Sequence, residues 1–317
     1  MRRFSRLALA CLAIAAGNGA QGEEALHLLI PGAAGGGWDR TARGVGEALT
    51  ASGLVNRVSF ENLSGGGGAR GIAHLIEAGD GTMLMVNSTP IVVRSLQGVF
   101  PQSFRDLTPL ASVIGDYSVI AVRQQSEVTH VAQLATRMRA APRAVAIGGG
   151  SVSGGTDHIV AALVFKGLGL DPRAVKYIPY DAGGKAMAGL LSGEVHALSS
   201  GYGEVVDLVD QGWVRIVCIA APERLERAPA VPTCEEQGAA GGVFVNWRGF
   251  FMAPSTAGER AAQLRALLGE LVTTAAWQTV RDRYGWLDLY RAGEDFVTLL
   301  EAQERALDEQ LRALGLL

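Results

Sequence analysis

The 317-residue sequence lacks the short motifs that mark most metal centres and catalytic nucleophiles. It has five histidines and three cysteines, but no H-E-x-x-H or C-x-x-C spacing that would bring metal ligands together. No serine has the G-x-S-x-G arrangement of a hydrolase nucleophile, and no G-K-[ST] completes a nucleotide-binding P-loop. We therefore expect no metal, no cofactor and no catalytic residue.

An excess of positive charge is also missing. The sequence has 28 basic and 31 acidic side chains, and three of the basic ones, Arg2, Arg3 and Arg6, lie at the extreme N-terminus. Proteins that bind nucleic acid need a basic face, so we expect no nucleic-acid partner. A small anion needs only a local positive field, and the composition leaves that class of ligand open.

Long apolar runs are absent after the N-terminus. The three N-terminal arginines precede an apolar run over residues 7–16, and the small residues Ala20 and Gly22 follow it, an order typical of a secretion signal. This run is well short of the roughly 20 residues that span a bilayer, so an uncleaved anchor is the weaker alternative. We expect residues 1–22 to be a signal peptide, cleaved near residue 22, and the mature protein to be periplasmic.

Two cysteines remain after such a cleavage. Cys218 lies in the β-like segment V-R-I-V-C-I-A-A, and Cys234 follows V-P-T. An oxidising compartment permits a disulfide between them. Free cysteine is, however, a common small core residue, and both positions are apolar. The sequence therefore favours two free thiols, with the disulfide as the alternative.

Short β-rich segments alternate with helical patterns along most of the chain, which is typical of parallel α/β units. The expected strands cover residues 26–30, 58–62, 83–87, 145–148, 176–179, 196–199 and 215–220, and the expected helices cover 41–51, 69–78, 156–168 and 185–191. From residue 258 to the C-terminus, the apolar spacing is mostly helical.

Strand-like stretches at 119–123 and 216–220 bracket a segment long enough to form its own lobe. We expect an α/β fold of two lobes, with residues 23–117 plus 221–317 in a discontinuous lobe I and residues 118–220 in lobe II. In open α/β folds, ligands bind where strands end and helices begin. The ligand cleft is therefore expected between the lobes, at the strand-to-helix loops.

Four of these loops are rich in glycine: 31–39 (PGAAGGGWD), 62–71 (NLSGGGGARG), 148–158 (GGGSVSGGTDH) and 180–186 (YDAGGKA). Glycine lets backbone N–H groups approach a ligand closely. Each loop precedes a helix whose first N–H groups are unpaired and carry partial positive charge. Two loops fall in each expected lobe, which favours a shared anion site over four unrelated tight turns.

The second loop also fits G-x-G-x-x-G through Gly66, Gly68 and Gly71, a motif of dinucleotide-binding folds. The strand that follows ends at Asn87 and Ser88, without the acidic side chain that holds a ribose hydroxyl. An exported protein also lies outside the cytosolic cofactor pool. We therefore reject the dinucleotide interpretation.

In their order, these loops, the later S-G-Y-G-E at 200–204 and N-W-R-G-F-F-M-A-P at 246–254 resemble the periplasmic solute receptors of tripartite tricarboxylate transporters. The resemblance runs from about residue 26 to the C-terminus, and GGGWD, GGTDH, SGYGE and NWRG are most similar to the branch named for citrate and other tricarboxylates. It implies a two-lobed periplasmic-binding-protein fold, type II-like, whose cleft holds a small organic carboxylate. It also implies the large and small integral membrane subunits of a transporter as partners.

The resemblance further implies a set of ligand-binding positions. In lobe I these are Gly36, Gly37, Trp38, Asp39, Ser64, Gly67, Gly68, Ser88 and Thr89. In lobe II they are Ser151, Ser153, Gly155, Thr156, Asp157, Gly183 and Gly184. Two charged residues complete the set: Arg248, and Lys185, where the family often has an uncharged or acidic residue.

Several of these positions have a structural alternative. Trp38 either covers the ligand or fills the edge of a lobe. Asp157 begins a helix, where the helix dipole favours an acid without any ligand. Arg248 either binds a ligand carboxylate or pairs with a structural acid, and the second role is slightly favoured. Lys185, in the first turn of a helix, would ordinarily be solvated.

The sequence thus predicts a receptor that closes on an organic carboxylate, such as citrate or another di- or tricarboxylate, and delivers it to a membrane permease. Two alternatives stay open. A receptor of the same fold can act as an extracytoplasmic sensor that presents its ligand to a membrane kinase. An exported α/β hydrolase would need Ser151 or Ser153 as the nucleophile and His158 as the base.

Overall fold

The computed structural model describes residues 23–79, 81–256 and 258–317, and the expected signal peptide, residues 1–22, lies outside the described residues. The strands are β1 (Glu23–Ile30), β2 (Val55–Asn62), β3 (Met83–Ser88), β4 (Thr108–Arg123), β5 (Ala146–Gly149), β6 (Lys176–Pro179), β7 (Ala197–Gly201), β8 (Val214–Ile219), β9 (Val245–Met252) and β10 (Leu287–Ala292). The helices are α1 (Gly37–Ala51), α2 (Ala69–Ala78), α3 (Pro90–Leu96), α4 (Val131–Ala140), α5 (Thr156–Gly167), α6 (Gly183–Ser192), α7 (Tyr202–Asp210), α8 (Gly258–Leu271), α9 (Ala275–Tyr284) and α10 (Glu294–Leu314). Within the described ranges, no helix combines the length and the hydropathy that crossing a membrane requires.

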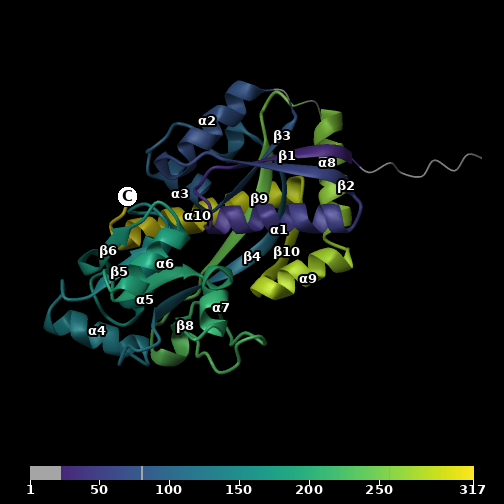
Figure 1. Ribbon diagram of the computed structural model, residues 1–317. Coiled ribbons are helices and arrows are strands. Elements are labelled where there is room, and N and C mark those ends of the chain that lie inside the picture. The colour runs from purple at the N-terminus through teal and green to yellow at the C-terminus, as the bar shows by residue number, and fades with distance from the viewer. Residues whose placement is uncertain (1–22, 80, 257) are drawn as a thin grey trace, which may run out of the picture.

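The strands form one hydrogen-bonded network in the order β2-β1-β3-β9-β4-β7-β5-β6, with β10 and β8 also paired to β4. At one end β1 is parallel to β2 and β3, and at the other β5 is parallel to β6 and β7. Helices α1, α2 and α3 follow the first three parallel strands, and α5, α6 and α7 follow the second three. Figure 1 shows α2 and α3 at the upper left, α1 across the middle, and the second group at the lower left.

Strand β4 connects the two ends of the network. Its residues 108–117 pair with β9, whereas residues 118–123 pair with β7 and β8. Twelve of its 16 residues are buried, among them the polar Ser112, Asp116 and Ser118, so the strand runs through the interior of the network. We call the part built on β1, β2, β3, β9 and β10 the first half, and the part built on β5 to β8 the second half. The lobe boundaries predicted from the sequence remain a proposal.

Helices cover both faces of the sheet. In β1, Leu28 packs into one cluster with α1, α8 and α9, whereas its neighbour Leu29 packs into another with α2, α3 and α10, because successive strand residues point to opposite faces. Helices α6 and α7 cover a third cluster in the second half, which includes Leu190, Leu198 and Val205. Helix α10 contacts both α3 and α5, so the C-terminal helix packs against both halves.

All seven strands predicted from the sequence are present, with ends displaced by at most a few residues, and so are the four predicted helices. The prediction missed β9, β10, α3, α4 and α7, and it found only the last five residues of β4. The predicted helical C-terminal part is confirmed except where β10 interrupts it and pairs with β4.

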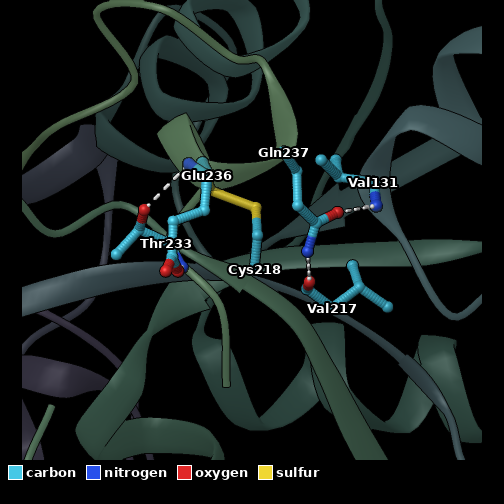
Figure 2. Close-up of a disulfide and its surroundings, with 7 residues drawn as sticks. Val131, Val217, Cys218, Thr233, Glu236 and Gln237 are labelled. Atoms are coloured by element: carbon cyan, nitrogen blue, oxygen red, sulfur yellow. Dashed lines mark hydrogen bonds between the residues drawn. A yellow bond between two sulfur atoms is a disulfide. The ribbon is translucent and has the colours of Figure 1, made fainter. Parts of the chain in front are cut away.

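The expectation of free thiols is wrong, because Cys218 and Cys234 form a disulfide with a Cα–Cα distance of 4.9 Å. The segment after β8 turns back, and the Cys234 N–H donates a hydrogen bond of 2.8 Å to the Ile219 carbonyl beside Cys218. Figure 2 shows that Gln237 lies next to the disulfide, where its side chain accepts from the Val131 N–H at 2.7 Å and donates to the Val217 carbonyl at 2.5 Å. The disulfide and Gln237 thus tie this returning segment to β8 and to the start of α4.

Candidate functional site

The carboxyl ends of the parallel strands in both halves face one pocket with a cavity volume of about 130 Å³. On the same measure a single water needs only roughly 10–15 Å³, so the pocket has room for a small organic molecule. Thirteen of the 18 predicted site residues line it: Gly36, Gly37, Trp38, Ser64, Gly67, Gly68, Ser88, Ser151, Gly155, Thr156, Asp157, Gly183 and Arg248.

Three helices begin at this pocket, and in α5 one of the first N–H groups, that of Asp157, already donates to the Ser151 hydroxyl at 3.0 Å. The N-cap residues of α1, α5 and α6 are Gly36, Gly155 and Ala182, and none of the three makes a side-chain capping hydrogen bond. All three line the pocket, so the first N–H groups of α1 from one half and of α5 and α6 from the other are near the same space. In α5, the Thr156 hydroxyl is buried and has no hydrogen-bond partner among the described residues. These groups together form a set of donors suited to an anion.

Glycine is required where the loops approach each other and the buried charges. A Cβ at Gly150 would lie 2.3 Å from the Gly183 nitrogen, and a Cβ at Gly37 would lie 2.1 Å from an Arg248 guanidinium nitrogen. Real Cβ atoms do not come so close to other heavy atoms. The glycine-rich composition seen in the sequence therefore has a packing reason at both positions.

Trp38 is held at the pocket by a specific contact. Its Nε1 donates a hydrogen bond of 2.9 Å to the Ser88 Oγ, which joins the first turn of α1 to the end of β3. The six-membered part of the indole lies against Gly68, where a Cβ would come within 3.3 Å of the ring. Trp38 thus lines the pocket and also packs the edge of the first half, so the two roles considered for it coexist.

Asp39 does not line the pocket, although the resemblance implied a ligand contact. Its carboxylate accepts hydrogen bonds from the Gly35 N–H at 3.0 Å, from Arg43 at 2.9 Å and from Asn62 at 3.0 Å. Burial alone would raise the pKa of Asp39, but these three hydrogen bonds hold it below its ordinary value. The Asp39 carboxylate therefore holds the glycine loop in shape without lining the pocket itself.

Asp157 has a comparable position in the second half, but it does line the pocket. Its carboxylate accepts from the backbone N–H groups of Gly150 and Ser151 and from the Ser151 hydroxyl. Burial, together with the nearby charge of Glu204, nevertheless raises the pKa of Asp157 to about 7. Two amides of the third glycine loop are thus occupied by the protein's own acid, and the remaining donors must hold an anion.

Arg248 has the structural role that the sequence slightly favoured. Its Nη2 is 3.1 Å from the Asp116 Oδ2 and 3.0 Å from the Glu204 Oε1, and the Arg248 side chain is 2% exposed. Desolvation raises the pKa of both Asp116 and Glu204, while the Arg248 charge opposes the rise. Arg248 therefore reaches the pocket as a cation already paired with two carboxylates, and little of its charge is left for a ligand.

Four other predicted residues lie beside the pocket without lining it: Thr89, Ser153, Gly184 and Lys185. The Thr89 hydroxyl is buried and accepts a hydrogen bond from Gln303 at 3.2 Å. The Lys185 ammonium is exposed and lies 3.3 Å from the Asp181 carboxylate, as expected of a solvated side chain in a first helical turn.

Other pocket residues were not predicted as site residues, among them Arg94, Tyr180, Asp181, Glu204 and Asn246. Glu204 and Asn246 belong to the S-G-Y-G-E and N-W-R-G motifs, so the signal for them was present in the sequence. Arg94 lies in α3, a helix that was not predicted from the sequence.

Of the residues that the hydrolase alternative needs, Ser151 and His158 make other contacts. His158 Nδ1 accepts from the Gly154 N–H at 2.9 Å, and its ring stacks on Tyr177 at 4.7 Å between centroids. The Ser151 hydroxyl accepts from the Asp157 N–H at 3.0 Å and is 3.2 Å from the Tyr177 hydroxyl. These contacts do not form a nucleophile–base pair, which would need the serine hydroxyl on a ring nitrogen of the histidine.

Comparison with known proteins identifies the same family that the sequence motifs resemble. Residues 41–296 match the family described as the tripartite tricarboxylate transporter family receptor. A protein from Agrobacterium vitis, described as a UPF0065 protein in the TAR-I ttuE-ttuC' intergenic region, is 24% identical over 292 residues, which cover 90% of this chain and 80% of the relative.

Solved structures with bound ligands share the fold. MatC from Rhodopseudomonas palustris with bound malate has a TM-score of 0.82 at 21% identity, over 91% of this chain and 99% of that one. R. palustris Rpa4515 with adipate has a TM-score of 0.84 at 20% identity, over 92% of this chain and 97% of that one. The predicted α/β, two-lobed periplasmic-binding-protein fold is therefore confirmed, and so is the resemblance that implied it.

Proposed function

Because the chain belongs to the tripartite tricarboxylate transporter receptor family, we propose that it captures a small organic carboxylate in the periplasm and delivers it to the large and small membrane subunits of a transporter. The receptor closes its two lobes on the ligand, and the loaded form is the one that the permease receives. The proposal includes export by a signal peptide over residues 1–22, which is cleaved near residue 22. It excludes a catalytic role.

The observation that supports the proposal most directly is the convergence of the N-termini of α1, α5 and α6 on one pocket, where none of the three N-cap residues supplies a side-chain cap. A hydrogen bond to a charged group contributes roughly 1.5–3 kcal/mol, and micromolar affinity requires about 8 kcal/mol. A handful of N–H and hydroxyl donors is therefore sufficient for a carboxylate, even though Arg248 is already paired and Asp157 occupies two amides.

Contacts between the two halves support closure as the mechanism. Arg40 in α1 lies 2.6 Å from the Asp207 carboxylate in α7, and Gln97 after α3 donates to the Gly154 carbonyl at 3.2 Å. A ligand shifts an open–closed equilibrium only through its difference in affinity for the two forms. Donors from both halves around one pocket supply that difference, because the closed form alone offers the whole set.

The proposed ligand class is the di- and tricarboxylates. The similar structures hold malate and adipate, and the sequence motifs resemble the citrate branch. Isothermal titration of the mature protein with malate, adipate and citrate tests the proposal. We expect saturable binding of at least one of these acids.

A matched pair of threonine variants tests the pocket itself. Thr156→Val removes the buried, unpartnered hydroxyl and should weaken binding about 10-fold or more. Thr136→Val removes a hydroxyl that bonds the Ala132 carbonyl in α4, away from the pocket, and should leave the affinity unchanged. The proposal is wrong if no organic acid binds, or if an acid is turned over and His158→Ala abolishes the turnover.

A further inference from the structure

Three of the five charged side chains that line the pocket are paired. Arg248 is shared between Asp116 and Glu204, and Asp181 pairs with Lys185. Among the lining residues this leaves two charges without an oppositely charged partner: Asp157, whose pKa is raised to about 7, and the guanidinium of Arg94. Among the described residues that line the pocket, Arg94 is thus the one cation that is not paired with a carboxylate.

Arg94 makes contacts only with neutral groups in the described part of the chain. Its Nη1 donates to the Gln97 Oε1 at 3.0 Å and to the Ser153 carbonyl at 3.4 Å. Its Nε is buried and has no hydrogen-bond partner, and no carboxylate of the described residues forms an ion pair with it. A guanidinium has five N–H donors and stays charged at neutral pH. The partly buried Arg94 guanidinium therefore has N–H donors and a positive charge available for an anion.

The position of Arg94 differs from that of the other anion-binding groups. Around Gly150, Gly183 and Glu204 the starts of α1 and α6 come together. Arg94 lies instead beside Gly67 of the first half and reaches the Ser153 carbonyl of the second half. The pocket therefore offers two kinds of anion-binding group, the helix starts around Gly183 and the Arg94 guanidinium beside Gly67.

We propose, on the premise that the protein is a carboxylate receptor, that Arg94 binds a second carboxylate of the ligand and thereby selects organic diacids over monoacids. One carboxylate of the ligand accepts hydrogen bonds from the helix starts and Thr156. The other end of the ligand places its carboxylate on Arg94, where a planar guanidinium and a carboxylate match in geometry and charge. A monoacid leaves Arg94 desolvated and unpaired in the closed form, which penalises it relative to a diacid.

Arg94 also makes diacid binding dependent on closure. Its contact with Ser153 crosses between the halves, so the guanidinium has this second contact only when the second half is close. A second carboxylate on Arg94 therefore stabilises the closed form more than the open form. This gives the diacid a second advantage, because closure is what the ligand must stabilise.

The experiment compares acids of equal chain length that differ by one carboxylate: succinate with butyrate, and adipate with hexanoate. Affinities are measured by isothermal titration on the mature protein, with monoacids that give little heat measured by competition. We expect the wild type to prefer the diacid of at least one pair by 10-fold or more. Arg94→Gln should reduce diacid affinity roughly 10- to 100-fold and monoacid affinity little. Arg94→Lys, which keeps the charge, should retain part of the preference.

Arg139→Gln is the matched control. It removes the same charge from an exposed arginine of α4 that donates to the Leu168 carbonyl, so it should leave all affinities unchanged. Thermal unfolding of each variant shows whether it is folded, and Arg94→Lys carries the test if Arg94→Gln is not. Equal losses for diacids and monoacids in Arg94→Gln, or no loss, overturn the role of Arg94 and leave the receptor function standing. Absence of binding by the wild type overturns the receptor function itself.

Discussion

The Ser64 hydroxyl of the first half donates a hydrogen bond of 2.9 Å to the Asp181 carboxylate of the second half. Both residues lie on loops that line the pocket, and the contact exists only when the halves are close. A hydrogen bond to a carboxylate is stronger than one between neutral groups, but this one is solvent-exposed. It is therefore a modest, measurable stabiliser of the closed form.

Ser64→Ala should weaken ligand binding about 2- to 10-fold, because the closed form loses a contact that the open form does not make. Isothermal titration with the best organic acid measures the change. Ser59→Ala is the control, since the Ser59 hydroxyl pairs with His27 at 2.8 Å within the first half and should not affect closure. An equal effect of the two substitutions would show that the Ser64 contact has no link to binding.

The second prediction concerns pH. Because the pKa of Asp157 is raised to about 7, the folded protein keeps this proton at pH values where the unfolded chain, with an ordinary value of 3.8, has lost it. Stability from this group is therefore present at low pH and is lost as the pH rises towards about 7. Ligand affinity should follow the same direction, because a neutral Asp157 does not repel a bound carboxylate.

Titrations from about pH 6 to about pH 8.5 should show affinity falling as the pH rises through about 7, by at most roughly 10-fold per pH unit for one proton. Asp157→Asn keeps an acceptor for the Gly150 and Ser151 amides, so it should bind at least as tightly as the wild type at high pH. Its affinity should no longer vary across this range. A pH profile identical to that of the wild type would exclude Asp157 as the titrating group.

The third prediction concerns the buried cluster of charged side chains around Arg248. Arg248→Met removes the cation that Asp116 and Glu204 share and leaves two carboxylates in a buried site. Breaking a buried pair of this kind lowers the free energy of unfolding by about 3–5 kcal/mol. Urea unfolding followed by circular dichroism measures it. Arg260→Met, which removes a more exposed pair with Glu23, is the control and should lower stability by about 1 kcal/mol or less.

The contrast between what the sequence predicted and what it missed has a physical basis. The strands β1 and β5 and the glycine loops after them were predictable because their signals are local: an apolar run, then glycines, then a helical pattern. Strand β9 was missed because it carries Arg248 in a buried segment, and a charged residue argues against a buried strand unless its partners are known. Those partners, Asp116 and Glu204, are distant in the sequence.

The disulfide was only the weaker alternative in the sequence, and Arg94 was missed, for related reasons. The sequence does not show that the chain after β8 returns to place Cys234 beside Cys218. The role of Arg94 depends on which charges around it are already neutralised, and that requires the three-dimensional pairing of every other ionisable group in the pocket. Local pattern thus predicts where a site is, whereas the electrostatic balance of its residues comes from contacts between distant segments.

The disulfide supplies the fourth prediction. A bridge across a segment of this length contributes about 3 kcal/mol by restricting the unfolded chain, so reduction, or the double substitution Cys218→Ser and Cys234→Ser, should lower the free energy of unfolding by about 2–4 kcal/mol. Ligand affinity should be unchanged, because neither cysteine lines the pocket. Reductant should have no effect on the double variant. Equal stability of the wild type with and without reductant would contradict the expected contribution.

The last prediction compares alanine substitutions at two adjacent glycines. A Cβ at Gly37 would lie 2.1 Å from the Arg248 guanidinium and 2.6 Å from the Glu204 carboxylate, whereas a Cβ at Gly36 would have its nearest neighbours at 3.6 Å. Gly37→Ala therefore forces the buried ion pair apart and should lower stability by about 1–3 kcal/mol, with a loss of affinity because both partners line the pocket. Gly36→Ala, at a φ of −86° that alanine adopts readily, should leave the stability nearly unchanged. Thermal unfolding and titration of the two variants in parallel measure the difference, and similar behaviour of the pair would mean that the ion pair moves aside without loss.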